Sequence, residues 1–360
     1  MTRLHLVNGF LGSGKTTAII EAARRHVLRG ERVGVVTNDQ GRYLVDTAFV
    51  SAQDIPVVQV TGGCFCCSYD QLLEVLTALH EDAQPQVIYA ESVGSCADLI
   101  ATVVRPLQGT PGRAVRCQSL SVFADSRLLL HLLRGDTLPL GDDVLYIIER
   151  QLAEAGLVVL NKWDLLHPQH RKELLSLAAD AFAGVPLLPQ NSLLPEEIAR
   201  WMEAIEGEEP ALPSAAVWVD YARYGRGETQ LAWIDRALLA RLPDQGRSEV
   251  VRLLQAISEA LEAHQVPVAH VKWHLSSETG TSKLSWTTLS QPDWASAVPA
   301  VSGTTQLLLN ARIQADSAQA GAWIDEALAR ALAASQAGWR IVAQETFAPS
   351  PPQRPARALP

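Results

Sequence analysis

The stretch that most constrains this chain is a glycine-rich loop near its start, Gly9–Thr17. It reads Gly-Phe-Leu-Gly-Ser-Gly-Lys-Thr-Thr and matches the pattern G-x-x-x-x-G-K-[ST]. An apolar strand, Leu4–Val7, precedes the loop, and a helical pattern, Ala18–Arg29, follows it. In that order, loop N–H groups and the positive end of the helix can hold phosphate oxygens. The residues predicted to bind phosphate or its metal are Gly9, Gly12, Ser13, Gly14, Lys15, Thr16 and Thr17.

Within this loop, two side chains have separate predicted tasks. We expect Lys15 to reach the β- and γ-phosphates of a nucleotide, and the Thr16 hydroxyl to ligate Mg²⁺. A chance glycine turn is the alternative, but the strand before the loop and the helix after it favour a nucleotide site.

Composition narrows the class of protein. The 360 residues are 48% hydrophobic and 19% charged, as in ordinary globular proteins. A net charge of −9 argues against a nucleic-acid-binding surface. No uncharged apolar run approaches the length of a membrane span, and the early first strand leaves no room for a secretory signal. We therefore expect a cytoplasmic protein that binds neither nucleic acid nor membrane.

A second loop carries three thiols in four positions, at Cys64, Cys66 and Cys67. Thiolates are soft ligands that suit Zn²⁺ or Cu(I), and the adjacent glycines Gly62 and Gly63 permit a sharp bend. Because only three sulfurs are local, the pattern predicts an open site whose fourth ligand is water, a substrate protein or a distant side chain. Buried packing of the thiols is the alternative, and we interpret the later Cys96 as such a packed thiol.

Two further strand ends carry carboxylates. Asp39 follows the strand Val33–Thr37 in a segment that often senses a γ-phosphate, although a surface turn would also explain its composition. Glu91 follows the strand Gln86–Ala90, where a carboxylate beside the glycine-rich loop would hold Mg²⁺ or its water. The N–H of Gly94 is then placed to meet the γ-phosphate.

The tetrapeptide Asn161-Lys-Trp-Asp164 follows another apolar strand, and N-K-x-D is a guanine signature. The Asp164 carboxylate can accept from guanine N1–H and its exocyclic amine, a donor pair that adenine lacks. Asn161 would contact the O6/N7 side of the base or brace the glycine-rich loop. Lys162 would lie over the base plane, and Asn191 would sit in a final guanine-contacting loop.

Alternating strands and helices predict a doubly wound, mainly parallel α/β sheet of the P-loop NTPase type over residues 1–205. The polar stretch 206–214, with its prolines, is the predicted linker. Residues 215–347 predict a smaller α+β domain of ferredoxin-like type. The proline-rich residues 348–360 predict a disordered tail.

The motif set Gly9–Thr17, Cys-x-Cys-Cys, Glu91-Ser-Val-Gly94 and Asn161-Lys-Trp-Asp164 resembles the CobW-type GTPases of the CobW/HypB/UreG superfamily, which are metallochaperones. The resemblance implies slow GTP hydrolysis with Lys15, Asp39 and Glu91 as catalytic residues. It also implies Mg²⁺ at Thr16 and Glu91. One departure is Arg42, which stands where the family commonly has a carboxylate.

From that resemblance we expect a divalent metal at Cys64, Cys66 and Cys67, most plausibly Zn²⁺, and a client metalloprotein that receives it. A homodimer is left open. Two alternatives remain at this point: a nickel-delivery maturation GTPase, and a non-enzymatic regulator that binds GTP and controls a partner through the second domain.

Overall fold

The computed structural model describes residues 1–39, 57–61, 64–109, 114–213, 215–335 and 337–355, without the side chains of residues 39, 57, 59 and 61. The chain divides into two compact units. Of the described residues, those up to Gly227 together with 352–355 form unit 1, and those from Glu228 to Pro351 form unit 2. The division at Gly227 lies beyond the expected linker, because Ala211 is hydrogen-bonded to the backbone of Gln118 and Leu120 in unit 1.

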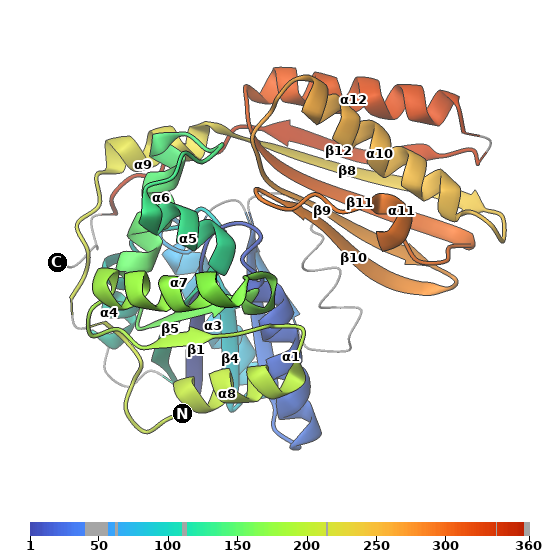
Figure 1. Ribbon diagram of the computed structural model, residues 1–360. Helices are drawn as coiled ribbons and strands as arrows, with labels where there is room; N and C mark the ends of the chain where they lie inside the picture. Colours follow the sequence, from blue (N-terminus) through green and yellow to red (C-terminus); the bar gives the residue numbers. More distant parts are fainter. Residues whose placement is uncertain (40–56, 62–63, 110–113, 214, 336, 356–360) are drawn as a thin grey trace. The chain divides into compact units, whose positions relative to one another are not determined.

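Unit 1 is built on a seven-stranded parallel sheet with the strand order β3-β2-β4-β1-β5-β6-β7. The inner strands β4 and β6 are buried along their whole length and are apolar up to the polar residue at their carboxyl end, as expected for parallel strands covered by helices on both faces. Helices cover both faces of this sheet, with α1 beside α8 and α5 beside α7 (Figure 1). The predicted doubly wound α/β fold is confirmed.

The bounds of these elements follow the sequence pattern closely. The strands are β1 (Thr2–Asn8), β2 (Val33–Asp39), β3 (Val57–Thr61), β4 (Val87–Glu91), β5 (Val115–Asp125), β6 (Leu157–Asn161) and β7 (Leu187–Pro189). The helices are α1 (Lys15–Leu28), α3 (Tyr69–Ala83), the π-helix η1 (Ile100–Val104), α4 (Arg105–Gln108), α5 (Ser126–Arg134), α6 (Asp142–Ala153), the 3-10 helix η2 (Trp163–Leu165), α7 (Pro168–Ala181), α8 (Pro195–Ile205) and α9 (Tyr221–Thr229). None of the described helices is both long and apolar enough to span a membrane.

The carboxyl ends of the strands bring the predicted site residues to one edge of the sheet. β1 lies next to β4 with Val7 opposite Glu91, and β4 lies next to β2 with Thr37 opposite Glu91. On the other side of β1, Asp125 of β5 pairs with Asn161 of β6. Ligands of open α/β sheets bind at this edge.

Unit 2 is a five-stranded antiparallel sheet in the order β10-β9-β11-β8-β12. Its strands and helices are β8 (Leu231–Leu242), α10 (Arg247–Ala263), β9 (Val268–Ser277), β10 (Gly280–Thr287), α11 (Trp294–Ala297), β11 (Gly303–Gln314), α12 (Ser317–Ala333) and β12 (Arg340–Phe347). Without β10 and α11 the order is β-α-β-β-α-β, so the ferredoxin-like prediction is confirmed.

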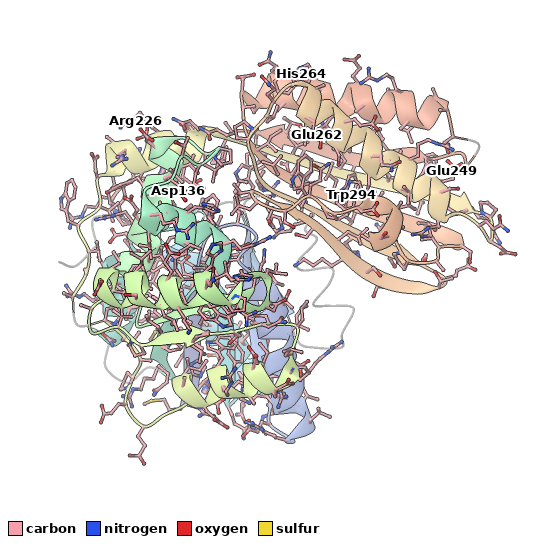
Figure 2. The ribbon with its side chains drawn as sticks, in the orientation of Figure 1. Asp136, Arg226, Glu249, Glu262, His264 and Trp294 are labelled. Carbon is pink, nitrogen blue, oxygen red and sulfur yellow. The ribbon has the colours of Figure 1, made fainter. Side chains whose placement is uncertain are left out.

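Helices α10 and α12 lie on the same face of this sheet (Figure 1). The apolar core between them and the strands includes Leu253, Trp273 and Leu309. Trp294 of α11 joins that core next to α10 (Figure 2), where its Nε1 donates to Ser258 Oγ at 2.7 Å. The tryptophans of this core therefore serve packing, as expected for aromatic side chains in a small domain.

Candidate nucleotide and thiol site

The glycine-rich loop joins β1 to α1 with a backbone that only glycine fits at two places. Gly9 has φ 131°, and a Cβ added there would lie 2.1 Å from the Phe123 carbonyl oxygen. Gly14 has φ 96°, and its Cβ would lie 2.2 Å from Nδ2 of Asn161. Among the described residues no side chain caps α1 after Gly14. The N–H groups of the first helical turn are thus arranged as an anion site.

Lys15, Thr16 and Glu91 meet where β1 and β4 end. The Thr16 hydroxyl donates to Glu91 Oε1 at 3.0 Å, and Lys15 Nζ lies 3.8 Å from the same oxygen. Lys15 Nζ also donates to the Gly9 carbonyl oxygen at 2.8 Å. A hydroxyl and a carboxylate are the hard oxygen ligands that Mg²⁺ prefers, so this pair fits the predicted Mg²⁺ position.

Asn161, at the end of β6, ties the guanine signature to the glycine-rich loop. Its Nδ2 donates to the Ser13 carbonyl oxygen at 2.6 Å. Its Oδ1 accepts from the backbone N–H and the hydroxyl of Ser192, at 3.0 and 2.9 Å. Of the two roles that the sequence left open for Asn161, this geometry corresponds to the brace.

The other residues of the guanine signature lie at the rim. Lys162 Nζ forms an ion pair with Asp125 Oδ2 at 2.9 Å. Burial works to raise the pKa of Asp125, but hydrogen bonds from Arg127 and the charge of Lys162 lower it overall. Asp164 is exposed, and Asn191 Oδ1 accepts from a backbone N–H at 2.9 Å. Guanine binding at Asp164 and Asn191 stays a prediction.

The three thiols of the Cys-x-Cys-Cys loop converge on one point. The loop folds into a tight turn in which the N–H groups of Cys67 and Ser68 donate to the Cys64 carbonyl oxygen, at 3.0 and 2.8 Å. The sulfur atoms of Cys64, Cys66 and Cys67 all lie within 4.8 Å of one another. Cys64 and Cys66 are buried, whereas Cys67 is exposed. Three convergent sulfurs of this kind can hold a thiophilic metal ion.

A fourth thiol, which sequence reasoning treated as packing, joins this group. Cys96 Sγ lies 3.5 Å from Cys66 Sγ, which in turn lies 3.7 Å from Cys67 Sγ. We call Cys64, Cys66, Cys67 and Cys96 the thiol cluster. Only the sheet order could reveal this fourth member, because Cys96 follows β4 while the other three follow β3.

The thiols of the cluster act on one another electrostatically. Hydrogen bonds from Cys66, Cys67 and Cys96 hold the pKa of Cys64 well below its usual value. The same contacts with Cys64 raise the pKa of Cys66 and of Cys96. The cluster therefore stabilises one thiolate, centred on Cys64, and a thiolate is the form of cysteine that binds metal.

Polar side chains behind the cluster fix the backbone that carries Cys96. Gln151 Nε2 donates to the carbonyl oxygens of Gly94 and Cys96, at 3.0 and 2.9 Å. Asn8 Nδ2 donates to the Cys96 carbonyl at 3.2 Å and to Glu154 Oε1 at 3.3 Å. Burial raises the pKa of Glu154 to about 8. Sequence motifs gave no signal for this layer, which lies outside the loops that carry them.

The end of the chain also reaches the thiol cluster. The described tail residues 348–355 contain no helix or strand. Within them Pro352 is buried, and the backbone N–H of Gln353 hydrogen-bonds the Cys67 thiol. Contact with Cys64 nevertheless raises the pKa of Cys67 to about 11. The exposed member of the cluster thus has a backbone partner from the C-terminal segment.

Part of the predicted switch lies outside the described residues. The backbone of Asp39 ends β2, but its side chain is outside them, as are Arg42, Asp46 and the loop glycines Gly62 and Gly63. The preceding Asn38 is described, and it connects the switch to the thiol loop. Its Oδ1 accepts from the Phe65 N–H at 3.0 Å, and its Nδ2 donates to a β3 carbonyl at 3.2 Å.

The family model described as "CobW/HypB/UreG, nucleotide-binding domain" matches residues 3–185, slightly more than half of the chain. The chain belongs to the CobW/HypB/UreG family. The matched region contains the glycine-rich loop, the whole thiol cluster, Glu91 and the guanine signature, while Asn191 lies beyond its end. The family resemblance drawn from the motifs is confirmed.

Two curated proteins are similar to about half of the chain. The "Zinc chaperone YeiR" of Escherichia coli (strain K12) is 31% identical over 181 residues, which cover 48% of this chain and 50% of that protein. The "Zinc chaperone CobW" of Sinorhizobium sp is 30% identical over 184 residues, or 45% and 51%. The chain thus spans about half the length of the curated relatives it matches. Among solved structures, the Zn(II)-bound YjiA GTPase from E. coli is 15% identical to this chain, with a TM-score of 0.35. The match covers 90% of this chain and 98% of that one.

Proposed function

We propose that this protein is a GTP-hydrolysing metal chaperone that couples its nucleotide state to the binding and delivery of Zn²⁺. The observation that carries the proposal is the short connection between its two sites. Glu91 contacts Thr16 and Lys15 in the nucleotide site, and Cys96, five positions later, contacts Cys66 in the thiol cluster. A shift of Glu91 on nucleotide binding would therefore change the position of the Cys96 sulfur relative to the other thiols.

A second connection runs through Asn38. This residue stands at the end of β2, directly before the predicted switch residue Asp39, and its Oδ1 holds the Phe65 N–H inside the thiol loop. A switch that responds to the γ-phosphate would pull on this hydrogen bond. The thiol loop is thus attached to both segments that flank the predicted γ-phosphate position.

Hydrolysis in this proposal depends on positioning and charge. Lys15 Nζ would exchange its Gly9 carbonyl partner for the β- and γ-phosphates, while Asp39 orients the attacking water. When bound at Thr16 and Glu91, Mg²⁺ would neutralise part of the phosphate charge. Asp164 would select guanine. With no arginine finger assigned, intrinsic turnover is expected to be slow.

Zinc is the cargo that fits the donor set best, because thiolate sulfur is a soft ligand and Zn²⁺ accepts four such ligands tetrahedrally. Both relatives described above are named zinc chaperones. We further propose that a client metalloprotein receives the ion, and that the exchange occurs in the cytoplasm, where free thiols persist.

The coupling can be measured directly. Zn²⁺ affinity is determined by chelator competition with GDP, with a slowly hydrolysed GTP analogue and without nucleotide, and GTP affinity is determined with and without Zn²⁺. Single-turnover GTP hydrolysis is followed in the same mixtures, with Ni²⁺ as the comparison ion. Linkage requires the two affinities to change by the same factor, about 5–150-fold for a coupling of about 1–3 kcal/mol.

Two results would contradict the proposal. If GTP binds but neither hydrolysis nor metal affinity responds to the other ligand, the protein is a nucleotide-gated regulator instead. If Ni²⁺ and not Zn²⁺ changes the nucleotide affinity, the cargo is nickel. Cys117→Ser serves as the control, because Cys117 is a buried thiol in β5 outside the cluster.

A further inference from the structure

Cys96 has a fixed backbone that directs its side chain to the other thiols. Its N–H donates to the Val93 carbonyl at 2.9 Å, and its carbonyl accepts from Asn8 and Gln151. Cys96 is fully buried, and its sulfur lies against Cys66. The backbone at Cys96 therefore cannot move away from the cluster without breaking several hydrogen bonds.

Two of the sulfur–sulfur distances are close to those of a tetrahedral metal site, and the sulfurs of Cys64, Cys66 and Cys67 all lie within 4.8 Å of one another. With Zn–S bonds of about 2.3 Å, the sulfurs of a four-thiolate site stand about 3.8 Å apart. The Cys96–Cys66 and Cys66–Cys67 distances are 3.5 and 3.7 Å. Movements of a few tenths of an ångström between these pairs would bring them to coordination distance.

We propose that Cys96 is a zinc ligand, and that it completes a four-thiolate site with Cys64, Cys66 and Cys67. This inference rests on the proposed function only in taking Zn²⁺ as the cargo. It replaces the open fourth position, expected from the three local thiols, with a protein ligand that comes from the strand end that also carries Glu91.

The four ligands differ in exposure. Cys64, Cys66 and Cys96 are 4%, 1% and 0% exposed, whereas Cys67 is exposed. An incoming client thiolate can therefore reach the ion from the side of Cys67 and displace that ligand first. The three buried thiolates would retain the ion until the exchange is under way.

The binding step conserves charge and protons. Each thiol that becomes a ligand loses its proton to solvent, because the thiolate is the form that binds metal. No electron moves in this step. The protein must therefore be kept reduced, so that all four sulfurs can serve as ligands.

The test uses Co²⁺ as a spectroscopic substitute in the full-length protein. Thiolate-to-Co²⁺ charge-transfer absorbance reports the number of bound thiolates, and the visible bands report tetrahedral geometry. Cys96→Ser should lose about a quarter of the charge-transfer absorbance, as one of four ligands is removed. Its Zn²⁺ affinity should fall by about 10–100-fold or more, since even indirect changes at metal sites have effects of that size. Cys117→Ser should leave both values unchanged.

Each outcome decides a different question. Unchanged absorbance and affinity in Cys96→Ser would overturn the inference while leaving a three-thiol chaperone intact. Failure of the unaltered protein to bind Zn²⁺ or Co²⁺ at all would instead overturn the proposed function. If Cys96→Ser does not fold, X-ray absorption of the zinc-loaded, unaltered protein decides by its sulfur coordination number. Four sulfurs support the inference, and three contradict it.

Discussion

The nucleotide site and the thiol cluster share one edge of the parallel sheet, but they are prepared for their ligands differently. In the nucleotide site the charged groups contact each other or the backbone: Lys15 contacts Gly9 and Glu91, and Lys162 contacts Asp125. In the thiol cluster, by contrast, the Cys66 sulfur already lies 3.7 Å from the Cys67 sulfur and 3.5 Å from the Cys96 sulfur. Nucleotide binding therefore requires an exchange of partners, whereas metal binding requires mainly the loss of protons.

Under the proposed function, this difference would allow nucleotide binding and metal binding to affect each other. Any exchange of partners by Lys15 or Thr16 acts on Glu91, and the segment that follows Glu91 carries Cys96. In a loosely arranged cluster, the sulfurs could adjust to such a shift and the metal affinity would stay the same. A preorganised cluster instead changes its metal affinity when one of its sulfurs moves.

The largest effect is expected for a substitution in the nucleotide site. Lys15→Ala removes the cation that would bind the β- and γ-phosphates, and losing one partner of a buried charge pair costs about 2–5 kcal/mol. GTP affinity, measured by titration calorimetry, should fall accordingly, while Zn²⁺ should still bind. The exposed Lys172→Ala is the matched control. Retained GTP affinity in Lys15→Ala would refute the phosphate role of the loop.

Asp164→Asn tests the guanine end of the same site. The substitution should weaken GTP binding and favour xanthosine triphosphate, since each hydrogen bond to a charged group contributes about 1.5–3 kcal/mol. Competition between the two nucleotides measures the change in preference. Asp180→Asn, on an exposed position of α7, should leave the preference as it was. An unaltered preference in Asp164→Asn would rule out its role in base selection.

The pH dependence of stability tests the role of Glu154. This residue accepts a hydrogen bond from Asn8, which also donates to the Cys96 carbonyl. Burial raises its pKa from 4.5 to about 8 in the folded protein. The folded state thus binds the extra proton, and this stabilisation is complete below about pH 4.5 and is lost as pH rises through about 8. The slope is at most about 1.4 kcal/mol per pH unit in that window.

Denaturant unfolding at several pH values between 5 and 8 measures this slope. Glu154→Gln has no carboxyl proton at this position, so its stability should depend less steeply on pH than that of the unaltered protein. Glu149→Gln, at an exposed position of α6, which ends directly before Glu154, should keep the original slope. Identical slopes for all three proteins would show that Glu154 does not titrate in this window.

The smallest expected effect concerns the Asn38 connection. Asn38→Ala removes the acceptor of the Phe65 N–H. The coupling free energy between nucleotide and Zn²⁺ should therefore fall by about 0.5–2 kcal/mol. Asn38→Asp keeps that acceptor oxygen and should retain more of the coupling. The same pair of affinity measurements applies. Equal coupling in Asn38→Ala and the unaltered protein would show that the Asn38–Phe65 hydrogen bond does not carry the coupling.

The sequence predicted the parts of the site that lie within single motifs. The glycine-rich loop, the Cys-x-Cys-Cys turn and the guanine signature each depend on neighbours along the chain, so their spacing indicates their chemistry. Both fold types were also predictable, from the alternation of strands and helices in unit 1 and from the hairpin and flanking helices in unit 2.

Contacts between motifs were not predictable in the same way. That β4 lies next to β2, and so brings Cys96 to the thiols that follow β3, depends on strand order, which spacing along the chain does not encode. Gln151 and Glu154 read as ordinary polar residues of a helix, and only the fold brings Gln151 to the Cys96 carbonyl and Glu154 to the Asn8 side chain. Likewise, nothing in the proline-rich tail indicated that Gln353 would reach Cys67.

The hydrogen bonds that Gln151 and Asn8 make to the segment between Glu91 and Cys96 have a consequence for rates. We expect a segment held at Gly94 and Cys96 by side-chain amides to move as one piece. Small collective motions of this kind take about microseconds to milliseconds. Signalling between the sites should therefore be faster than the hydrolysis that triggers it, and the lifetime of GTP would set how long each zinc ion is held.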